Sequence, residues 1–87
     1  MNKVFAVKHE EKVLSLFMNI DDALKECERL KDRKVAYFNH LYGDNMGEVN
    51  VNQFVSKNKI IYSVSITHKI KDSATGYCFE IEIMEVK

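Results

Sequence analysis

Two stretches near the C-terminus alternate apolar and polar residues with a period of two, and this pattern constrains the fold more than any other. The apolar positions are Tyr62, Val64, Ile66, Phe79, Ile81 and Ile83, and the polar ones are Ser63, Ser65, Thr67, Lys69, Glu80 and Glu82. Such alternation is typical of antiparallel strands that bury one face and expose the other. The chain must therefore supply an element that covers the apolar face.

The covering element is predicted to be a single amphipathic helix over about residues 20–32. Asn19 is a favourable N-cap residue, and Asp21 and Asp22 place negative charge in the first turn, where the helix dipole favours it. The apolar residues that fall on one face at helical spacing are Ile20, Ala23, Leu24, Cys27 and Leu30. The opposite face carries charges of both signs, which indicates a solvated surface rather than a basic binding helix.

The remaining apolar and β-branched runs predict strands on both sides of this helix. Residues 4–7 and 13–18 indicate a hairpin, whose turn type stays open because its polar segment contains neither Asn-Gly nor Asp-Gly. Four more strands are predicted at 35–42, 48–55, 60–70 and 77–86. The predicted fold is α+β with the order ββαββββ, in which the last four strands form an antiparallel meander. Because the chain has no proline and only three glycines, we expect one domain over residues 1–87.

Residue parity predicts which apolar side chains share a face across the meander. The predicted neighbours are Val49 and Val51 with Val64 and Ile66, and in turn Val64 and Ile66 with Ile83 and Ile81. Both hairpins then present their apolar residues to the helix. The other face of the sheet is open in this arrangement. In the alternative that the pattern also allows, the N-terminal hairpin folds over that face and buries it.

The net charge and the N-terminal composition indicate which classes of partner and which cellular compartment to expect. Thirteen basic and thirteen acidic residues cancel, so no long-range field attracts the whole molecule to nucleic acid or to anionic membranes. The N-terminus lacks a long apolar run and a small-residue cleavage site, which indicates a cytoplasmic protein, in the host cytoplasm if it is viral. Cys27 and Cys78 lack metal-ligand spacing and are predicted to be reduced thiols.

The ionisable residues form no recognisable catalytic or metal motif. His9, His40 and His68 lack the spacing of a metal site, and strand alternation alone accounts for the neighbouring carboxylates of Glu80 and Glu82. The glycines of segment 43–47 predict a hairpin turn rather than a phosphate loop. We therefore predict a protein without cofactor or metal that is not an enzyme. In the enzymatic alternative, a nuclease, His40 or His68 acts as acid or base.

The strongest functional signal is an aromatic and amide cluster on the predicted strands 35–42 and 48–55. Its members are Phe38, His40, Tyr42, Asn50, Asn52 and Phe54. Alternation turns these side chains away from the helix, onto the open face of the sheet. Aromatic anchors beside directional amide groups suit a protein-recognition surface. These six residues are therefore predicted to bind a partner.

The N-terminal third contains three short segments in a characteristic order. They are Val4-Phe5-Ala6-Val7, Val13-Leu14-Ser15-Leu16-Phe17 and Asn19-Ile20-Asp21-Asp22-Ala23-Leu24, in a proline-free chain rich in lysine, asparagine and isoleucine. This pattern resembles that of small accessory proteins of tailed bacteriophages. The resemblance implies a stoichiometric inhibitor or adaptor that binds a host enzyme or defence factor and occludes part of its surface. It carries over no functional residues.

Two other uses of these surfaces stay open. An RNA- or single-stranded DNA-binding protein would stack bases on the same aromatic residues and contact phosphates through a local lysine cluster. Its lysines are Lys57, Lys59, Lys69 and Lys71. The exposed strand edges could also pair two copies of the chain in a homodimer. We rank binding to a protein partner first because the net charge is zero and no catalytic signature is present.

Overall fold

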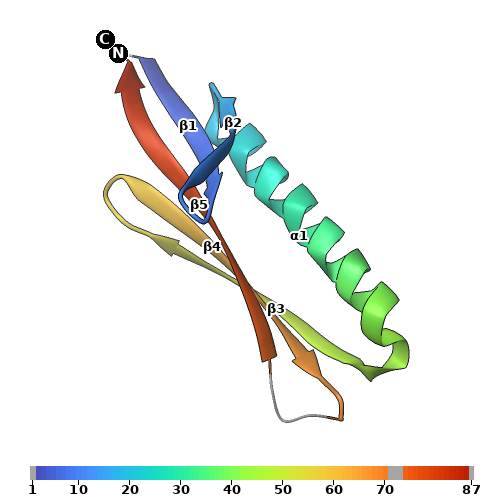
Figure 1. The fold of residues 1–87 in the computed structure, drawn as a ribbon. Helices are drawn as coiled ribbons and strands as arrows, with labels where there is room; N and C mark the ends of the chain where they lie inside the picture. Colours follow the sequence, from blue (N-terminus) through green and yellow to red (C-terminus); the bar gives the residue numbers. More distant parts are fainter. Residues whose placement is uncertain (1, 71–73, 87) are drawn as a thin grey trace.

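A single helix lies across one face of an antiparallel sheet in the computed structural model, which describes residues 2–70 and 74–86 (Figure 1). The elements are β1 (Asn2–His9), β2 (Lys12–Phe17), α1 (Ile20–Tyr42), the short 3₁₀ helix η1 (Gly43–Asn45), β3 (Met46–Val55), β4 (Lys59–His68) and β5 (Ala74–Val86). The α+β class is confirmed. In the described part of the chain three strands rather than four follow the helix, so the order is ββαβββ.

The five strands have the order β2-β1-β5-β4-β3, and all neighbours are antiparallel. The last strand, β5, lies at the centre of the sheet between β1 and β4. Because Asn2 lies opposite Val86, the two ends of the chain are adjacent (Figure 1). The N-terminal hairpin thus widens the sheet, and the alternative in which it folds over the open face is wrong.

The helix runs to Tyr42 instead of ending near residue 32, so the strand predicted at 35–42 is wrong. Its buried residues are Ala23, Cys27 and Phe38, which lie at helical spacing and continue one apolar face along the whole helix. Burial of Phe38 against the sheet outweighs the strand preference of the β-branched and aromatic residues around it, since that preference is weak and depends on context.

Among the residues that the structure describes, no helix is both long and apolar enough to cross a membrane.

Both ends of α1 have the chemistry that favours them. The Asp22 backbone N–H donates a hydrogen bond to the Asn19 side-chain oxygen (3.1 Å), which confirms Asn19 as the N-cap. Gly43 ends the helix with a φ of 53°, a conformation that glycine adopts without strain, and its N–H bonds to the Asn39 carbonyl oxygen. The 3₁₀ helix η1 therefore joins α1 to β3, which begins at Met46, and the prediction of a hairpin turn over 43–47 is wrong.

The core lies between α1 and the sheet. Its buried side chains are Val7, Ala23, Cys27, Phe38, Ile60, Tyr62, Val64, Ile66, Phe79 and Ile81. These include nearly the whole apolar set predicted for the last two strands, and Ile83 completes that face with partial exposure. The predicted division of β4 and β5 into a helix-covered and an open face is therefore confirmed.

The register of the last hairpin differs from the prediction without changing its faces. Val49 lies opposite Ile66 and Val51 opposite Val64, as parity predicted. Ile81, however, lies opposite Ile60, six positions along β4 from Ile66. Because the shift is an even number of residues, each side chain keeps its face.

The turn between β1 and β2 adopts an unusual backbone conformation for its residues. Glu10 and Glu11 have φ values of 52° and 67°. His9 and Lys12 pair directly across them, so this is a two-residue turn with the positive φ values of type I′. Asn-Gly or Asp-Gly normally occupies such a turn because other side chains are strained there. The hairpin was predicted correctly, although its turn lacks the favoured residues.

Candidate functional site

The structure separates the six predicted partner-binding residues. Three lie on α1 (Phe38, His40 and Tyr42) and three lie on β3 (Asn50, Asn52 and Phe54). Phe38 is only 3% exposed and belongs to the core, so its prediction as an exposed anchor is wrong. The reason is the period of the element, because on a helix Phe38 turns toward the sheet. The six residues therefore do not form one surface.

The aromatic residues at the end of α1 pack on one another. The Phe38 ring centroid lies 4.5 Å from that of Tyr42 and 4.9 Å from that of His68 on β4. Tyr42 and His68 meet edge to face at 4.9 Å. This cluster holds the last turn of the helix against β4. His40 is exposed on α1 outside these contacts.

The face of the sheet that α1 does not cover, here called the open face, carries a row of side chains across all five strands. The strand registers place Phe54 opposite Ile61, Ile61 opposite Glu80, Glu80 opposite Lys8, and Lys8 opposite Val13. Phe54 is 59% exposed and Val13 is 51% exposed. The row therefore has apolar, solvent-exposed ends and a charged centre.

A second row lies beside the first. Leu16 on β2 lies opposite Ala6, and Ala6 lies opposite Glu82, which in turn faces Lys59. Leu16 is 59% exposed and thereby extends the apolar end formed by Val13. At the other edge of the sheet, exposed Asn50 and Asn52 share the open face with Phe54, as predicted for these three residues.

Ion pairs neutralise the charged centre of the open face. Lys8 Nζ lies 2.9 Å from a Glu82 carboxylate oxygen and 3.8 Å from a Glu80 oxygen, and Lys59 Nζ lies 3.5 Å from Glu80. The hydrogen bond from Lys8 lowers the pKa of Glu82, and the same bond raises the pKa of Lys8. Two ammonium groups thus balance two carboxylates, so the centre of the face presents no net charge to a partner.

The lysines predicted to contact nucleic acid do not gather in one place. Lys57 lies in the turn before β4, and Lys59 begins that strand and pairs with Glu80. Lys69 follows the opposite end of β4, whose ten residues span about 33 Å. Lys71 lies outside the described residues. The described lysines therefore do not make one phosphate-binding cluster.

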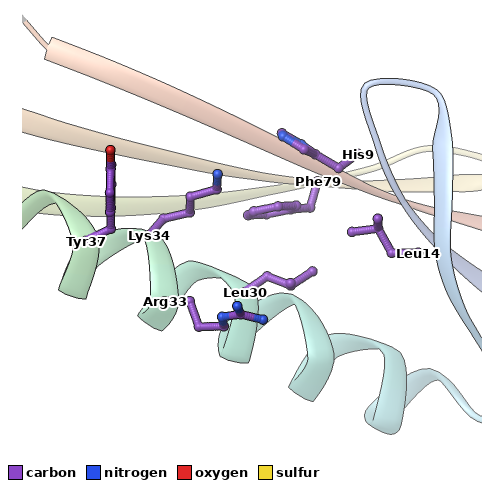
Figure 2. Close-up of a pocket in the computed structure, with 7 residues that line it drawn as sticks. All are labelled: His9, Leu14, Leu30, Arg33, Lys34, Tyr37 and Phe79. Carbon is purple, nitrogen blue, oxygen red and sulfur yellow. The ribbon is translucent and has the colours of Figure 1, made fainter.

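A groove opens on the helix side of the sheet, between α1 and the N-terminal hairpin (Figure 2). A β-bulge lies beside it: Val7 pairs with Ser15 but Lys8 pairs with Val13, which leaves Leu14 as the extra residue of β2. Leu14 lines the groove, which has a volume of about 420 Å³. We call this site the hairpin groove.

Apolar side chains from three elements form the floor of the hairpin groove. They are Leu14 of β2, Leu30 and Tyr37 of α1 and Phe79 of β5. Leu14 and Leu30 point toward each other, and the Phe79 ring lies between the strands and the helix (Figure 2). Phe79 is fully buried by its neighbours, whereas Tyr37 is 59% exposed. Phe79 is therefore the firmly packed part of the floor, whereas Leu14, 45% exposed, and Tyr37 are accessible to solvent.

Three nitrogen-bearing side chains complete the groove, namely His9, Arg33 and Lys34. The His9 ring packs on Phe79 with centroids 5.0 Å apart, and its Nδ1 donates a hydrogen bond to the Cys78 carbonyl oxygen (2.9 Å). That bond orients the ring, and Nε2 lies 3.9 Å from a Glu10 carboxylate oxygen. Lys34 Nζ lies 5.0 Å from the centre of the Tyr77 ring.

The remaining chemical features of the described residues concern metal binding and the cysteine thiols. No group of three His, Cys, Asp or Glu side chains could hold a metal ion in the part of the chain that the structure describes. Both cysteines are free. Burial raises the pKa of the Cys27 thiol to about 11, so this thiol is a poor nucleophile, whereas Cys78 is exposed on the open face.

Sequence reasoning missed the hairpin groove because it ended the helix too early. Once the helix continues past residue 32, Leu30, Arg33, Lys34 and Tyr37 fall at offsets of three, four and seven and share one side of it. That periodicity was available in the sequence. The bulge at Leu14 had no comparable signal, since the apolar run 13–18 reads equally well as a regular strand.

Comparison with known proteins adds no identification. No protein-family model matches the chain, and neither the curated proteins nor the solved structures show a significant match to it.

Proposed function

We propose that this protein is a non-catalytic binding module that captures a protein partner with the open face of its sheet. It would act stoichiometrically, as an inhibitor or adaptor that occludes part of the partner's surface. The observation that carries the proposal is the pair of apolar ends on a face that α1 leaves uncovered. Phe54 and Ile61 form one end, and Val13 and Leu16 form the other.

The chemistry of the open face resembles that of a protein interface more than that of a ligand site. Large apolar side chains supply the desolvation energy of most protein interfaces, and a few central anchors usually dominate it. The ion pairs of Lys8 and Lys59 keep the centre polar but neutral, so a partner need not compensate an excess charge. Asn50 and Asn52 add hydrogen-bonding groups beside Phe54.

The edge of the sheet supports the same proposal. β3 is an edge strand, and its last seven residues, 49–55, contain neither a charged residue nor a proline. Edge strands in monomers are normally protected by such residues, because unpaired backbone groups invite another strand. A partner that adds a strand to β3 would also cover Phe54. A second copy of this chain could use the edge in the same way, which would make a homodimer.

The proposal is tested by capturing partners from a host lysate with the tagged protein and with two variants. In the first variant, Phe54→Ser and Leu16→Ser remove one anchor from each end of the open face. In the matched control, Met18→Ser and Ile70→Ser remove two exposed apolar side chains that lie outside the strands. We expect the wild type and the control to retain the same partner in stoichiometric amount and the open-face variant to lose it.

Nuclease treatment and salt distinguish the alternatives in the same experiment. A protein complex held by apolar contacts should survive both, whereas a nucleic-acid complex should dissociate steeply between about 0.05 and 0.2 M salt. The mass of the captured species separates a foreign partner from a second 10.1 kDa chain. Retention of the partner by the Phe54 and Leu16 variant would exclude the open face as the binding surface.

A further inference from the structure

The hairpin groove contains two neighbouring cations of α1, Arg33 and Lys34. Elsewhere on the helix, Arg29 forms a bidentate pair with Glu26, and Lys31 pairs with Asp32 at 2.8 Å. Among the described residues, no carboxylate lies within 4.0 Å of Arg33 or Lys34, and none lines the groove. In a chain with zero net charge, this local excess of positive charge above an apolar floor is a distinct chemical feature.

We propose that the hairpin groove binds a small aromatic acid, that is, a ligand with an aromatic body and one anionic carboxylate. The aromatic body would lie between Leu14 and Leu30, on the edge of Phe79. The carboxylate would meet Arg33 and Lys34 at the rim. This site is on the helix side of the sheet, so the proposal is independent of the function proposed for the open face.

The dimensions and packing of the groove match such a ligand. Pockets for small molecules occupy roughly 300–1,000 Å³, are mostly apolar and carry a few polar groups that orient the ligand. The hairpin groove, at about 420 Å³, lies at the lower end of that range and suits one fused ring system. Leu14 and Leu30 supply apolar contacts on two sides, and Tyr37 can cover a third.

The polar rim selects for charge and for one orientation. Guanidinium and ammonium groups form shorter and stronger hydrogen bonds to a carboxylate than to a neutral acceptor. The His9 ring is held by its bond to the Cys78 carbonyl oxygen and by its packing on Phe79, so it forms a fixed wall of the groove. Glu10 lies near His9 at the mouth and disfavours an anionic group there. The carboxylate is thereby directed toward Arg33 and Lys34.

The test compares indole-3-acetate with indole-3-ethanol, which has a similar apolar body and no charge. Each compound is titrated into the ¹⁵N-labelled full chain, and the amide chemical shifts are followed by NMR. We expect saturable shifts centred on Leu14, Leu30, Tyr37 and Phe79. The acid should bind at least about fivefold more tightly than the alcohol, because the two rim cations interact only with its carboxylate.

Variants assign that preference to the rim. Arg33→Gln with Lys34→Gln should reduce the ratio of the two affinities to about one, whereas Lys25→Gln with Lys57→Gln, which changes the net charge equally outside the groove, should leave the ratio unchanged. Arg33→Gln alone replaces an exposed side chain and should lose part of the preference with the fold retained. Leu14→Ala should weaken the acid and the alcohol alike.

Three results would each overturn the proposal. They are shifts that map outside the groove, equal affinities of the wild type for the acid and the alcohol, and an undiminished preference in the Arg33 and Lys34 variant. None of them would bear on partner capture by Phe54 and Leu16. Conversely, the open-face variants that lose partner capture should still bind indole-3-acetate.

Discussion

The β1–β2 turn should become more stable when its two glutamates are replaced by Asn and Gly. Glu10 and Glu11 have φ values of 52° and 67°, and a left-handed conformation costs a residue with a Cβ atom about 1–2 kcal/mol. Asn tolerates this conformation better, and Gly adopts it without that cost. Glycine also loses about 0.5–1 kcal/mol more backbone entropy on folding. The combined change Glu10→Asn and Glu11→Gly should therefore raise the free energy of unfolding by about 1–2 kcal/mol.

Urea denaturation provides the measurement. The midpoint should rise with an unchanged m value, and the melting temperature should rise by about 4–8 °C for each kcal/mol gained. The control, Glu10→Gln with Glu11→Gln, removes both charges but keeps both Cβ atoms, so it should stay within about 0.5 kcal/mol of the wild type. If the Gln variant were stabilised as much as the Asn-Gly variant, charge rather than backbone strain would explain the effect. No stabilisation in the Asn-Gly variant would refute the strain argument itself.

Three further predictions follow from the burial and pairing of single residues. Phe38→Ala should lower the free energy of unfolding, measured by urea denaturation, by about 3–5 kcal/mol because it leaves a cavity in the core. The control Tyr37→Ala should lower it by less than about 1 kcal/mol. Similar losses of stability in the two variants would contradict the core position of Phe38. Glu82→Gln should lower the melting temperature only above about pH 4.5. The pKa of the Glu82 carboxyl is lowered from 4.5 in the folded protein, chiefly by the hydrogen bond from Lys8. The ionised carboxylate therefore stabilises the fold above about pH 4.5, and this stabilisation disappears as the pH falls through the pKa of the folded state. A difference between wild type and variant that persists at pH 2 would refute this account. Iodoacetamide at pH 8 should modify only Cys78 in the native protein, and Cys27 only after unfolding. Burial keeps the Cys27 thiol protonated and inaccessible to the reagent. Two modifications of the native protein, detected by mass spectrometry, would contradict this prediction.

The helix illustrates why local patterns predicted one boundary and missed the other. Its start depends on Asn19 and the acidic first turn, which act within a few residues of one another, and the prediction was correct. Its continuation through 35–42 depends on Phe38 finding a place against β4, near His68. That contact joins residues distant in the sequence, so intrinsic strand preference was a poor guide.

The candidate sites show the same division. Asn50, Asn52 and Phe54 were correctly assigned to the open face because strand parity alone decides it. The partner-binding role of these residues stays a prediction. The hairpin groove could have been anticipated only in part, because helical spacing relates Arg33 and Tyr37, whereas the register shift at Leu14 arises from the pairing of β2 with β1.

The sequence by itself determined the α+β class, the N-cap at Asn19 and the face on which each side chain of the last two strands lies. These features arise from capping and from periodicities of two and 3.6 residues, which act between near neighbours. Tertiary structure alone decided the strand order, the continuation of the helix through residues 35–42 and the register shift at Leu14. The central pairing of β5 with β1 joins the two ends of the chain, as in the bond from Lys8 to Glu82, and no local preference specifies a contact across 74 residues.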